Sequence, residues 1–489
     1  MKNSIRLLCG FSAVCASVTL SSLSHADEFL FVGPYAYYSF EDVNNSWSPK
    51  PAKPSGDASN YGWAIGNSFL FDLGKNPSTP AGIVVKNYDS ESILMVKDMK
   101  FNLPGMAFIV TGKENGTTYY PNLVVTDSFV IDGSTEGKSV IDINDFHQLD
   151  MGNVEIGTNL SSGCTNETSL RYILKSLPDT PYYYNSSKDC YIAADFDSVT
   201  LNGSEPLNMW TLNTAIWYLH RNTSTTAQNL VVRVGGLNGT GLVRNNSMDN
   251  VADTTTLVFA NQKDAYFKGI LADDWATAKK SSIYIIMDGS ASATQTIVNV
   301  GADSLCVWGR DNLDAVATSI RSGTLAISGK DTIEFARVEI AGGALAVAES
   351  DGTGNGGHLW VRGIDWIDGK IKISINNTSL KSTNGISQLG DESSKYVFEV
   401  DLSNFASDFN FEGDEYTVLQ SDGNLFGDVS KYEAEFTYNG SKIEGLLYEF
   451  YAYDYGLNVS IMGTIPEPSH IGFALGAFAI AAAIIRKRK

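Results

Sequence analysis

The stretch Ser322-Gly-Thr-Leu-Ala-Ile-Ser328 recurs, with the same alternation of small and apolar residues, as Gly342-Gly-Ala-Leu-Ala-Val-Ala348. A looser third copy follows as Gly369-Lys-Ile-Lys-Ile-Ser374. A short strand with a glycine turn, repeated every roughly 20–30 residues, is typical of a chain that winds into stacked coils. The repeat therefore predicts an all-β fold, a parallel β-helix or solenoid.

In such a solenoid each coil lays its strand on the strand of the coil before it. We therefore expect Leu325, Leu345 and Ile371 to stack in one inward row. Ile327, Val347 and Ile373 form the next inward row. A set of separate β-sandwich domains is the alternative, because sandwiches also alternate apolar and polar residues between turns.

Alternation extends over most of the chain in short runs bounded by Gly, Asn or Asp, as in Ser139-Val-Ile-Asp-Ile143. This pattern predicts strands and turns. The exceptions are 166–175 and 207–220, for which we expect helices. From about residue 395 the strands become rich in aromatic residues, which indicates a small antiparallel β module or the capping end of the solenoid.

A family resemblance follows from the glycine-rich turn Gly235-Gly-Leu-Asn-Gly-Thr-Gly241, the strand Thr256-Leu-Val-Phe259 and the strand Phe267-Lys-Gly-Ile-Leu271. Together with the repeat at 322–328, they resemble the autotransporter-associated β-strand repeat over about 230–375. The resemblance implies a right-handed parallel β-helix.

The C-terminal segment combines Pro466-Glu467-Pro468, an uncharged apolar run and the four cations Arg486, Lys487, Arg488 and Lys489. A run of this length fits a single transmembrane helix at 469–485, with the basic residues as its cytoplasmic anchor. The three parts in this order resemble the PEP-CTERM sorting signal of Gram-negative bacteria. The resemblance implies processing by an exosortase-type protease and delivery to the cell surface or extracellular matrix.

The N-terminus independently predicts export. Lys2 and Arg6 precede an apolar run too short to span a membrane well, and small residues stand before the Ala26–Asp27 bond. This order is that of a signal peptide cut by signal peptidase between Ala26 and Asp27.

Charge and cysteine content limit the possible partners. The chain carries 55 acidic against 35 basic residues, so its body repels nucleic acid and we expect none as a partner. In an oxidising compartment Cys164 and Cys190 form a disulfide or remain thiols, and the sequence leaves both open. Cys306 lies among apolar residues, which favours a buried thiol.

Motifs that carry chemistry are few. The pairs Asp142/Asp145, Asp195/Asp197, Asp273/Asp274 and Asp365/Asp368 suit a glycosidase or Ca²⁺, although turns prefer Asp too. Asp195 and Asp197 would share one face of a strand. The motif Gly352-Thr-Gly-Asn-Gly-Gly357 precedes a strand, so we expect a turn and not a dinucleotide site. His147, His220 and His358 belong to no catalytic motif. Tyr-rich strands and Trp residues suit either packing or sugar stacking.

These observations predict a signal peptide at 1–26, a β-solenoid at 27–394 with a Cys-bridged insertion near 160–220, a β module or cap at 395–463, and a sorting signal at 464–489. We expect an exported structural or adhesive protein that contacts extracellular polysaccharide. We expect no catalytic residue, no metal and no cofactor. A carbohydrate-active enzyme, a polysaccharide lyase or glycosidase, is the alternative. It would need a groove with clustered carboxylates beside a Lys or Arg.

Overall fold

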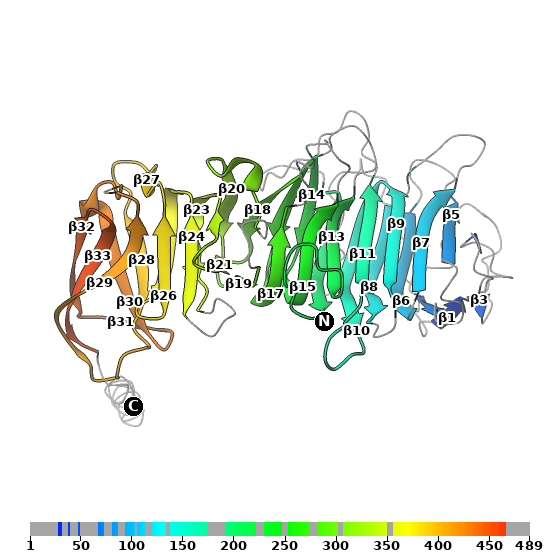
Figure 1. The fold of residues 1–489 in the computed structure, drawn as a ribbon, viewed down its shortest axis with the longest axis horizontal. Helices are drawn as coiled ribbons and strands as arrows, with labels where there is room; N and C mark the ends of the chain where they lie inside the picture. Colours follow the sequence, from blue (N-terminus) through cyan, green and yellow to red (C-terminus); the bar gives the residue numbers. More distant parts are fainter. Residues whose placement is uncertain are drawn as a thin grey trace, which may run out of the picture.

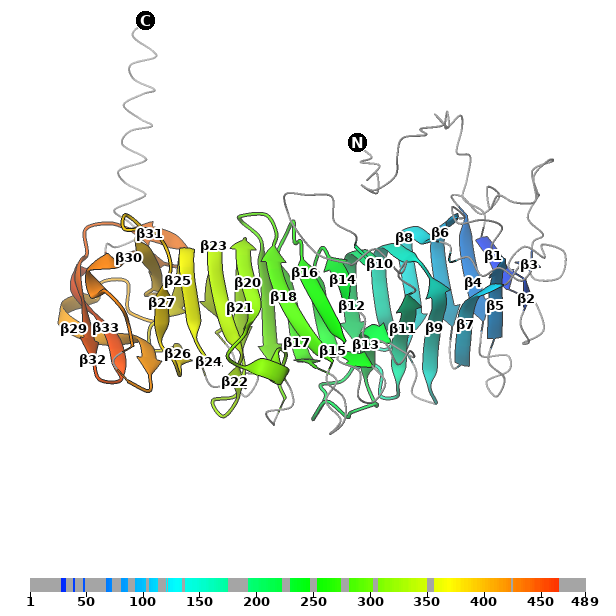
Figure 2. The ribbon, with the colours of Figure 1, turned by 90° about the horizontal axis from the view of Figure 1, so that it is seen from above.

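The chain forms an elongated rod of β-strands that follow one another along the long axis, from β1 at one end to β33 at the other (Figures 1 and 2). The computed structural model describes residues 28–31, 38–39, 47–48, 67–72, 81–86, 93–102, 105–112, 120, 122–133, 137–174, 192–221, 229–246, 253–273, 281–301, 307–349, 356–423 and 425–465.

The strands of the N-terminal half are β1 (Glu28–Phe31), β2 (Tyr38–Ser39), β3 (Trp47–Ser48), β4 (Ser68–Asp72), β5 (Ala81–Lys86), β6 (Ile93–Asn102), β7 (Gly105–Gly112), β8 (Asn122–Asp132), β9 (Ser139–Phe146), β10 (Gln148–Thr158), β11 (Thr168–Leu174), β12 (Ala194–Asn202), β13 (Ala215–Arg221), β14 (Asn229–Val234), β15 (Leu237–Asn246), β16 (Thr254–Phe259) and β17 (Ala265–Ala272).

The C-terminal half contains β18 (Ser282–Asp288), β19 (Thr294–Asn299), the 3₁₀ turn η3 (Arg310–Asn312), β20 (Val316–Ser322), β21 (Thr324–Ser328), β22 (Glu334–Phe335), β23 (Arg337–Val347), β24 (Gly357–Val361), β25 (Ile364–Ser374), β26 (Thr378–Ser382), β27 (Ile386–Gln388), β28 (Tyr396–Asp401), β29 (Asn410–Ser421), η4 (Val429–Lys431), β30 (Tyr432–Tyr438), β31 (Ser441–Ile443), β32 (Leu447–Tyr453) and β33 (Gly456–Thr464).

Most strands pair in parallel with the strand one coil further along the chain. Face A of the rod contains the parallel ladder β14–β16–β18–β20. Face B includes β19–β21–β23 and β25–β28–β30. Face C contains β5–β7–β9–β11–β13. Long strands bend from one face to the next. For example, β15 pairs with β12 through Leu237–Thr240 and with β13 from Leu242 onward.

The register of the repeats is the predicted one. Leu325 lies beside Leu345, and Leu345 lies beside Ile371. Ile327 likewise lies beside Val347. Leu325, Leu345 and Ile371 are all fully buried, so this row is confirmed as part of the core.

Aromatic side chains continue the core at both ends of the rod. Phe71 and Phe101 stack with ring centroids 4.6 Å apart, and Phe129 follows 5.3 Å from Phe101. Near the other end, Trp366 packs at 5.3 Å against both Tyr396 and Phe398. These rings fill the interior coil by coil, as the parallel register requires.

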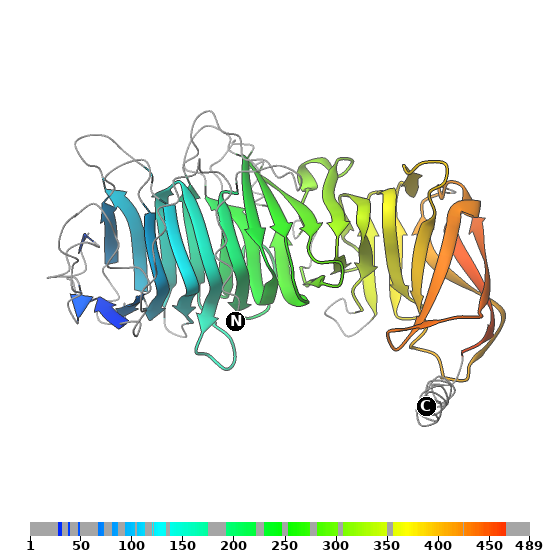
Figure 3. The same ribbon diagram turned by 180° about the vertical axis from the view of Figure 1, so that it is seen from behind.

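The last part of the rod changes from parallel to antiparallel pairing. β28 and β30 still extend the parallel ladder of face B beyond residue 395. β29, β33 and β32 then form an antiparallel sheet, and β31 pairs antiparallel with β30. Figure 3 shows these strands crossing the end of the rod. We call this antiparallel part the cap.

Three expectations require correction. The predicted fold class was wrong as stated because it included a transmembrane helix. The structure is all-β, and the part of the chain that it describes holds no helix long and apolar enough to cross a membrane. The segment 469–485 lies outside the described residues. The predicted helices at 166–175 and 207–220 were also wrong, because Thr168–Leu174 and Ala215–Arg221 are strands of face C. Pairing with β9 and β15 outweighs the local helix preference there.

Candidate binding pocket in the cap

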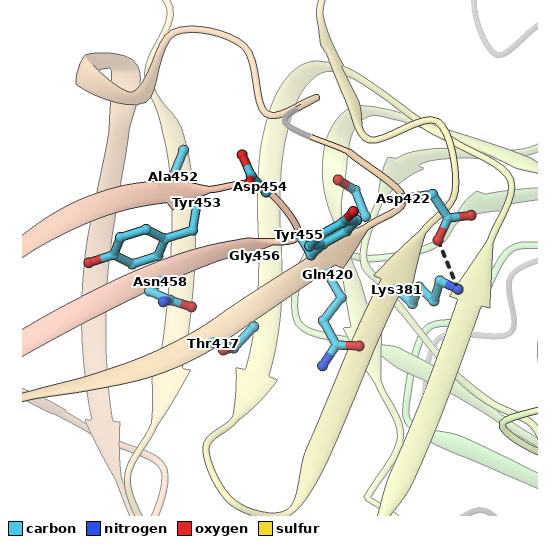
Figure 4. Close-up of a pocket in the computed structure, with 11 residues that line it drawn as sticks. Lys381, Thr417, Gln420, Asp422, Ala452, Tyr453, Asp454, Tyr455, Gly456 and Asn458 are labelled. Carbon is cyan, nitrogen blue, oxygen red and sulfur yellow. Dashed lines mark ion pairs between the residues drawn. The ribbon is translucent and has the colours of Figure 1, made fainter.

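A hollow of about 760 Å³ lies where the cap meets the last coils of the rod (Figure 4). β26, β29 and the β32–β33 hairpin supply its walls. Its lining residues are Lys381, Thr417, Gln420, Ser421, Asp422, Ala452, Tyr453, Asp454, Tyr455, Gly456 and Asn458. We call it the cap pocket.

Backbone pairing sets the position of the two tyrosines. Tyr453 pairs with Gly456 at the end of the hairpin, so Asp454 and Tyr455 form its turn. The amide of Ser421 donates to the Tyr455 carbonyl at 3.1 Å, which ties the turn to β29. Tyr453 remains 51% and Tyr455 69% exposed. Two aromatic side chains are therefore presented to solvent on a backbone held at several points.

Charged groups on the pocket wall are held by contacts to their neighbours. Lys381 Nζ lies 3.1 Å from Asp422 Oδ1, the ion pair drawn in Figure 4. The same ammonium lies 4.4 Å from the centre of the Trp360 ring, a cation–π distance. These contacts orient Lys381 while leaving about a third of its side chain exposed (35%).

The Tyr453 hydroxyl lies near the carboxylate of Glu415, which accepts from it at 3.3 Å. The negative charge of Glu415, with some desolvation and this hydrogen bond, raises the pKa of the Tyr453 hydroxyl above its ordinary value. The hydrogen bond to Glu415 also holds the Tyr453 hydroxyl on the side of β29.

This arrangement suits a hydroxyl-rich ligand. Aromatic faces accept the apolar side of a sugar ring, while a carboxylate, an amide and an ammonium nearby satisfy its hydroxyl groups. The pocket is open and polar, and within the described residues no group of His, Cys, Asp and Glu side chains is suited to a metal ion.

A second hollow, of about 530 Å³, lies on the side of the rod at the bend between faces A and B. It extends from β10 to the turn between β16 and β17. We call it the lateral hollow, and its lining residues are Asn153, Asp195, Asp197, Ser198, Arg233, Gly235, Gly236, Asn238, Ala260, Gln262, Lys263, Asp264 and Ala265.

Among the predicted acid pairs whose side chains the structure describes, only Asp195 and Asp197 come together at such a hollow. They share the outward side of β12 on either side of buried Phe196, as predicted. Asp195 Oδ2 lies 3.0 Å from Arg233 Nη1. The lateral hollow therefore places a carboxylate beside an arginine.

The other acids have local structural roles. Buried Asp142 pairs with Arg171 at 2.6 Å, and Asp365 pairs with Arg337. Asp273 accepts backbone N–H groups from three residues of the following coil. Asp368 accepts from the Gly369 amide within β25, where the register with β23 shifts. The side chain of Asp145 and all of Asp274 lie outside the described residues.

The remaining candidates do not form a site. His358 Nδ1 contacts Ser379 Oγ at 2.5 Å, and the strand expected after the glycine motif is confirmed as β24. Cys164 is buried, and burial raises the pKa of its thiol. Cys190 and Cys306 lie outside the described residues, so the disulfide stays a prediction.

The residues predicted for export and sorting also lie outside the described part of the chain. They are Ala26, Asp27, Pro466, Glu467, Pro468, Arg486, Lys487, Arg488 and Lys489. Their roles stay predictions.

Together, the strand pairing and the two hollows define an all-β rod with polar surface sites. Comparisons with protein-family models, with curated proteins and with solved structures found no match.

Sequence patterns gave only part of the cap pocket. The tyrosine-rich strands were open to packing or sugar stacking, and the structure shows Tyr453 and Tyr455 exposed. No sequence signal indicated Lys381, because it reaches the pocket from β26, a strand far from the hairpin in sequence.

Proposed function

We propose that the protein is an exported structural and adhesive component of the cell surface or extracellular matrix, and that it binds polysaccharide through the cap pocket. The observation that carries this proposal is the pair of exposed tyrosines, Tyr453 and Tyr455, on a turn tied to β29. Exposed aromatic rings leave apolar surface in contact with water, which is unfavourable, and a bound sugar ring would cover that surface.

The rod itself supports a structural role. Its core continues through the stacked coils, and its outer surface carries interleaved charges such as Lys370 and Lys372 beside Glu399. Such a surface stays solvated, while the parallel strand ladders hold the rod extended between its two ends. The export and sorting signals support surface delivery by signal peptidase and an exosortase-type protease. Surface labelling of intact cells tests that location, and protein found only inside the cells contradicts it.

Polysaccharide binding is tested with the double variant Tyr453→Ala with Tyr455→Ala. Affinity electrophoresis in gels containing dextran, a neutral β-1,4-glucan, polygalacturonate or chitosan identifies the polymer that retards the wild type. We expect the double variant to lose roughly tenfold or more in affinity, since covering about 40 Å² of each ring contributes about 1 kcal/mol at roughly 25 cal/mol per Å².

Leu447→Ala is the matched control. Leu447 lies on the same hairpin and is 66% exposed, but it is not part of the cap pocket. We expect the control to bind like the wild type. Equal binding by the double variant and the wild type would contradict the proposal.

A second candidate function is a carbohydrate-active enzyme acting at the lateral hollow. The observation that favours it is the carboxylate–arginine arrangement of Asp195, Asp197 and Arg233. Release of reducing or unsaturated sugar ends from any of the four polymers would establish it. Binding without such products supports the adhesive role.

A further inference from the structure

We propose that the lateral hollow is a second polysaccharide site, which binds an extended neutral glycan along the rod axis and makes the protein a cross-linker of glycan chains. The choice of ligand class rests on the proposed function. The site is inferred from the lining, coil spacing and charges of the hollow.

The floor of the hollow is made of residues that lack bulky side chains. A Cβ at Gly235 would lie 2.3 Å from the carbonyl oxygen of Asp197, and one at Gly236 would lie 3.1 Å from the Cβ of Ala265. Gly235 is therefore required for the close approach of two coils. Gly235 and Gly236 line the hollow at this close approach, so backbone forms part of its wall.

The hollow runs across successive coils. Asn153 comes from β10, Asp197 from β12, Asn238 from β15 and Lys263 from the turn before β17. Neighbouring coils are about 4.8 Å apart, as paired strands always are. This spacing is close to the length of one sugar residue in an extended chain. Each coil can thus present polar groups to one sugar.

The charges of the walls are nearly balanced. Asp195 is paired with Arg233 at 3.0 Å, and Asp264 Oδ1 accepts from the Thr294 amide at 2.8 Å. Lys263 and Asp197 are exposed at the rim. Three carboxylates and two cations interleave with amide side chains.

Such walls match hydroxyl groups, because a hydroxyl donates to a carboxylate and accepts from an ammonium or amide. A polyanionic glycan fits less well, because the carboxylates outnumber the cations and would repel it. The geometry therefore favours a neutral polymer over a polyuronate.

Two sites on one rod have a measurable consequence. The cap pocket is lined from β26, β29, β32 and β33, and the lateral hollow from strands and turns between β10 and β17. Figure 1 shows these two sets of strands at different positions along the rod. One molecule can then hold two polymer chains, or hold one chain at two points with increased avidity. Cross-linking raises the viscosity of a polymer solution, which a single-site binder does not do.

The test uses a soluble neutral β-1,4-glucan and, for comparison, polygalacturonate. The groove variant is Asp197→Ala with Lys263→Ala. Its matched control is Lys97→Ala with Asp127→Ala, which removes the same pair of charges from the same bend outside the hollow. Circular dichroism confirms that each variant is folded. Calorimetry with glucan oligosaccharides measures affinity, and viscometry with the polymer measures cross-linking.

We expect the wild type to bind two oligosaccharides per chain and to thicken the neutral glucan. The groove variant should bind one, with the affinity of the cap pocket unchanged, and should not thicken the polymer. We expect the groove variant and the wild type to bind polygalacturonate equally, because the lateral hollow does not bind this polymer. The control should behave like the wild type.

The outcomes separate the two proposals. A groove variant that binds and thickens like the wild type overturns the second site, whatever the cap variant does. If the groove variant loses one site while Tyr453→Ala with Tyr455→Ala loses none, the second site stands and the cap pocket fails. Release of reducing ends from the glucan at the lateral hollow also overturns the inference, because the hollow would then be an enzyme site.

Discussion

Replacing Leu345 by alanine tests whether the stacked inward row holds the rod together. Leu345 is fully buried between Leu325 and Ile371, which are themselves fully buried. Strand pairing holds the two neighbouring coils at a fixed spacing, so they cannot move inward to fill the space that the side chain leaves. The substitution should therefore produce a cavity that persists.

The magnitude follows from two contributions. Removing the three carbon atoms costs about 2–2.5 kcal/mol of lost burial, at roughly 0.8 kcal/mol each. A residual cavity of about 50 Å³ adds about 1.2 kcal/mol at roughly 24 cal/mol per Å³. We expect the free energy of unfolding to fall by about 3–4 kcal/mol.

Urea unfolding followed by circular dichroism and by tryptophan fluorescence measures the loss. Lys372→Ala is the control, because Lys372 belongs to the next coil but is 35% exposed and makes an ion pair with Glu399 at 3.4 Å. A partly exposed pair contributes at most about 1 kcal/mol. If Leu345→Ala lowers the free energy of unfolding no more than Lys372→Ala does, the stacked row does not stabilise the rod as we expect.

Two further predictions concern charged and titrating groups. Asp142→Asn leaves Arg171 largely buried without its carboxylate partner, which lies 2.6 Å away, and should destabilise the fold by about 3 kcal/mol in urea unfolding. A loss below about 1 kcal/mol would contradict this role. Second, Tyr453 should titrate above the usual value of about 10, and Glu415→Gln should lower its pKa. Because the folded-state pKa is raised, the associated stabilisation is complete below the ordinary pKa and disappears as the pH rises through the raised one. NMR titration of the Tyr453 ring checks both points, and a titration unaffected by Glu415→Gln would refute the assignment.

The register of the coils could be predicted because it depends on a local repeat. The spacing of Leu325, Leu345 and Ile371 states directly which residues lie side by side. The helices expected at 166–175 and 207–220 failed for the opposite reason. There the conformation is fixed by the strands on either side, and those partners are distant in sequence.

The two hollows also differ in how much of each could be predicted from the sequence. Asp195 and Asp197 were predicted to share a face because strand geometry alone decides it. That Arg233 lies beside Asp195 depends on the pairing of β12 with β14, which the sequence does not state. The cap pocket needed even more distant contacts, since Lys381 and the Tyr455 turn are brought together only by the packing of β26 and β29.

The switch to antiparallel pairing after β30 has a consequence for growth of the rod. β30 is followed by β31, a short strand whose Ser441 and Lys442 are exposed, so the end of the ladder offers a second molecule little backbone to extend. A fibre formed by adding copies end to end is disfavoured at this terminus. The length of the rod is then set by the number of coils in one polypeptide and does not depend on protein concentration.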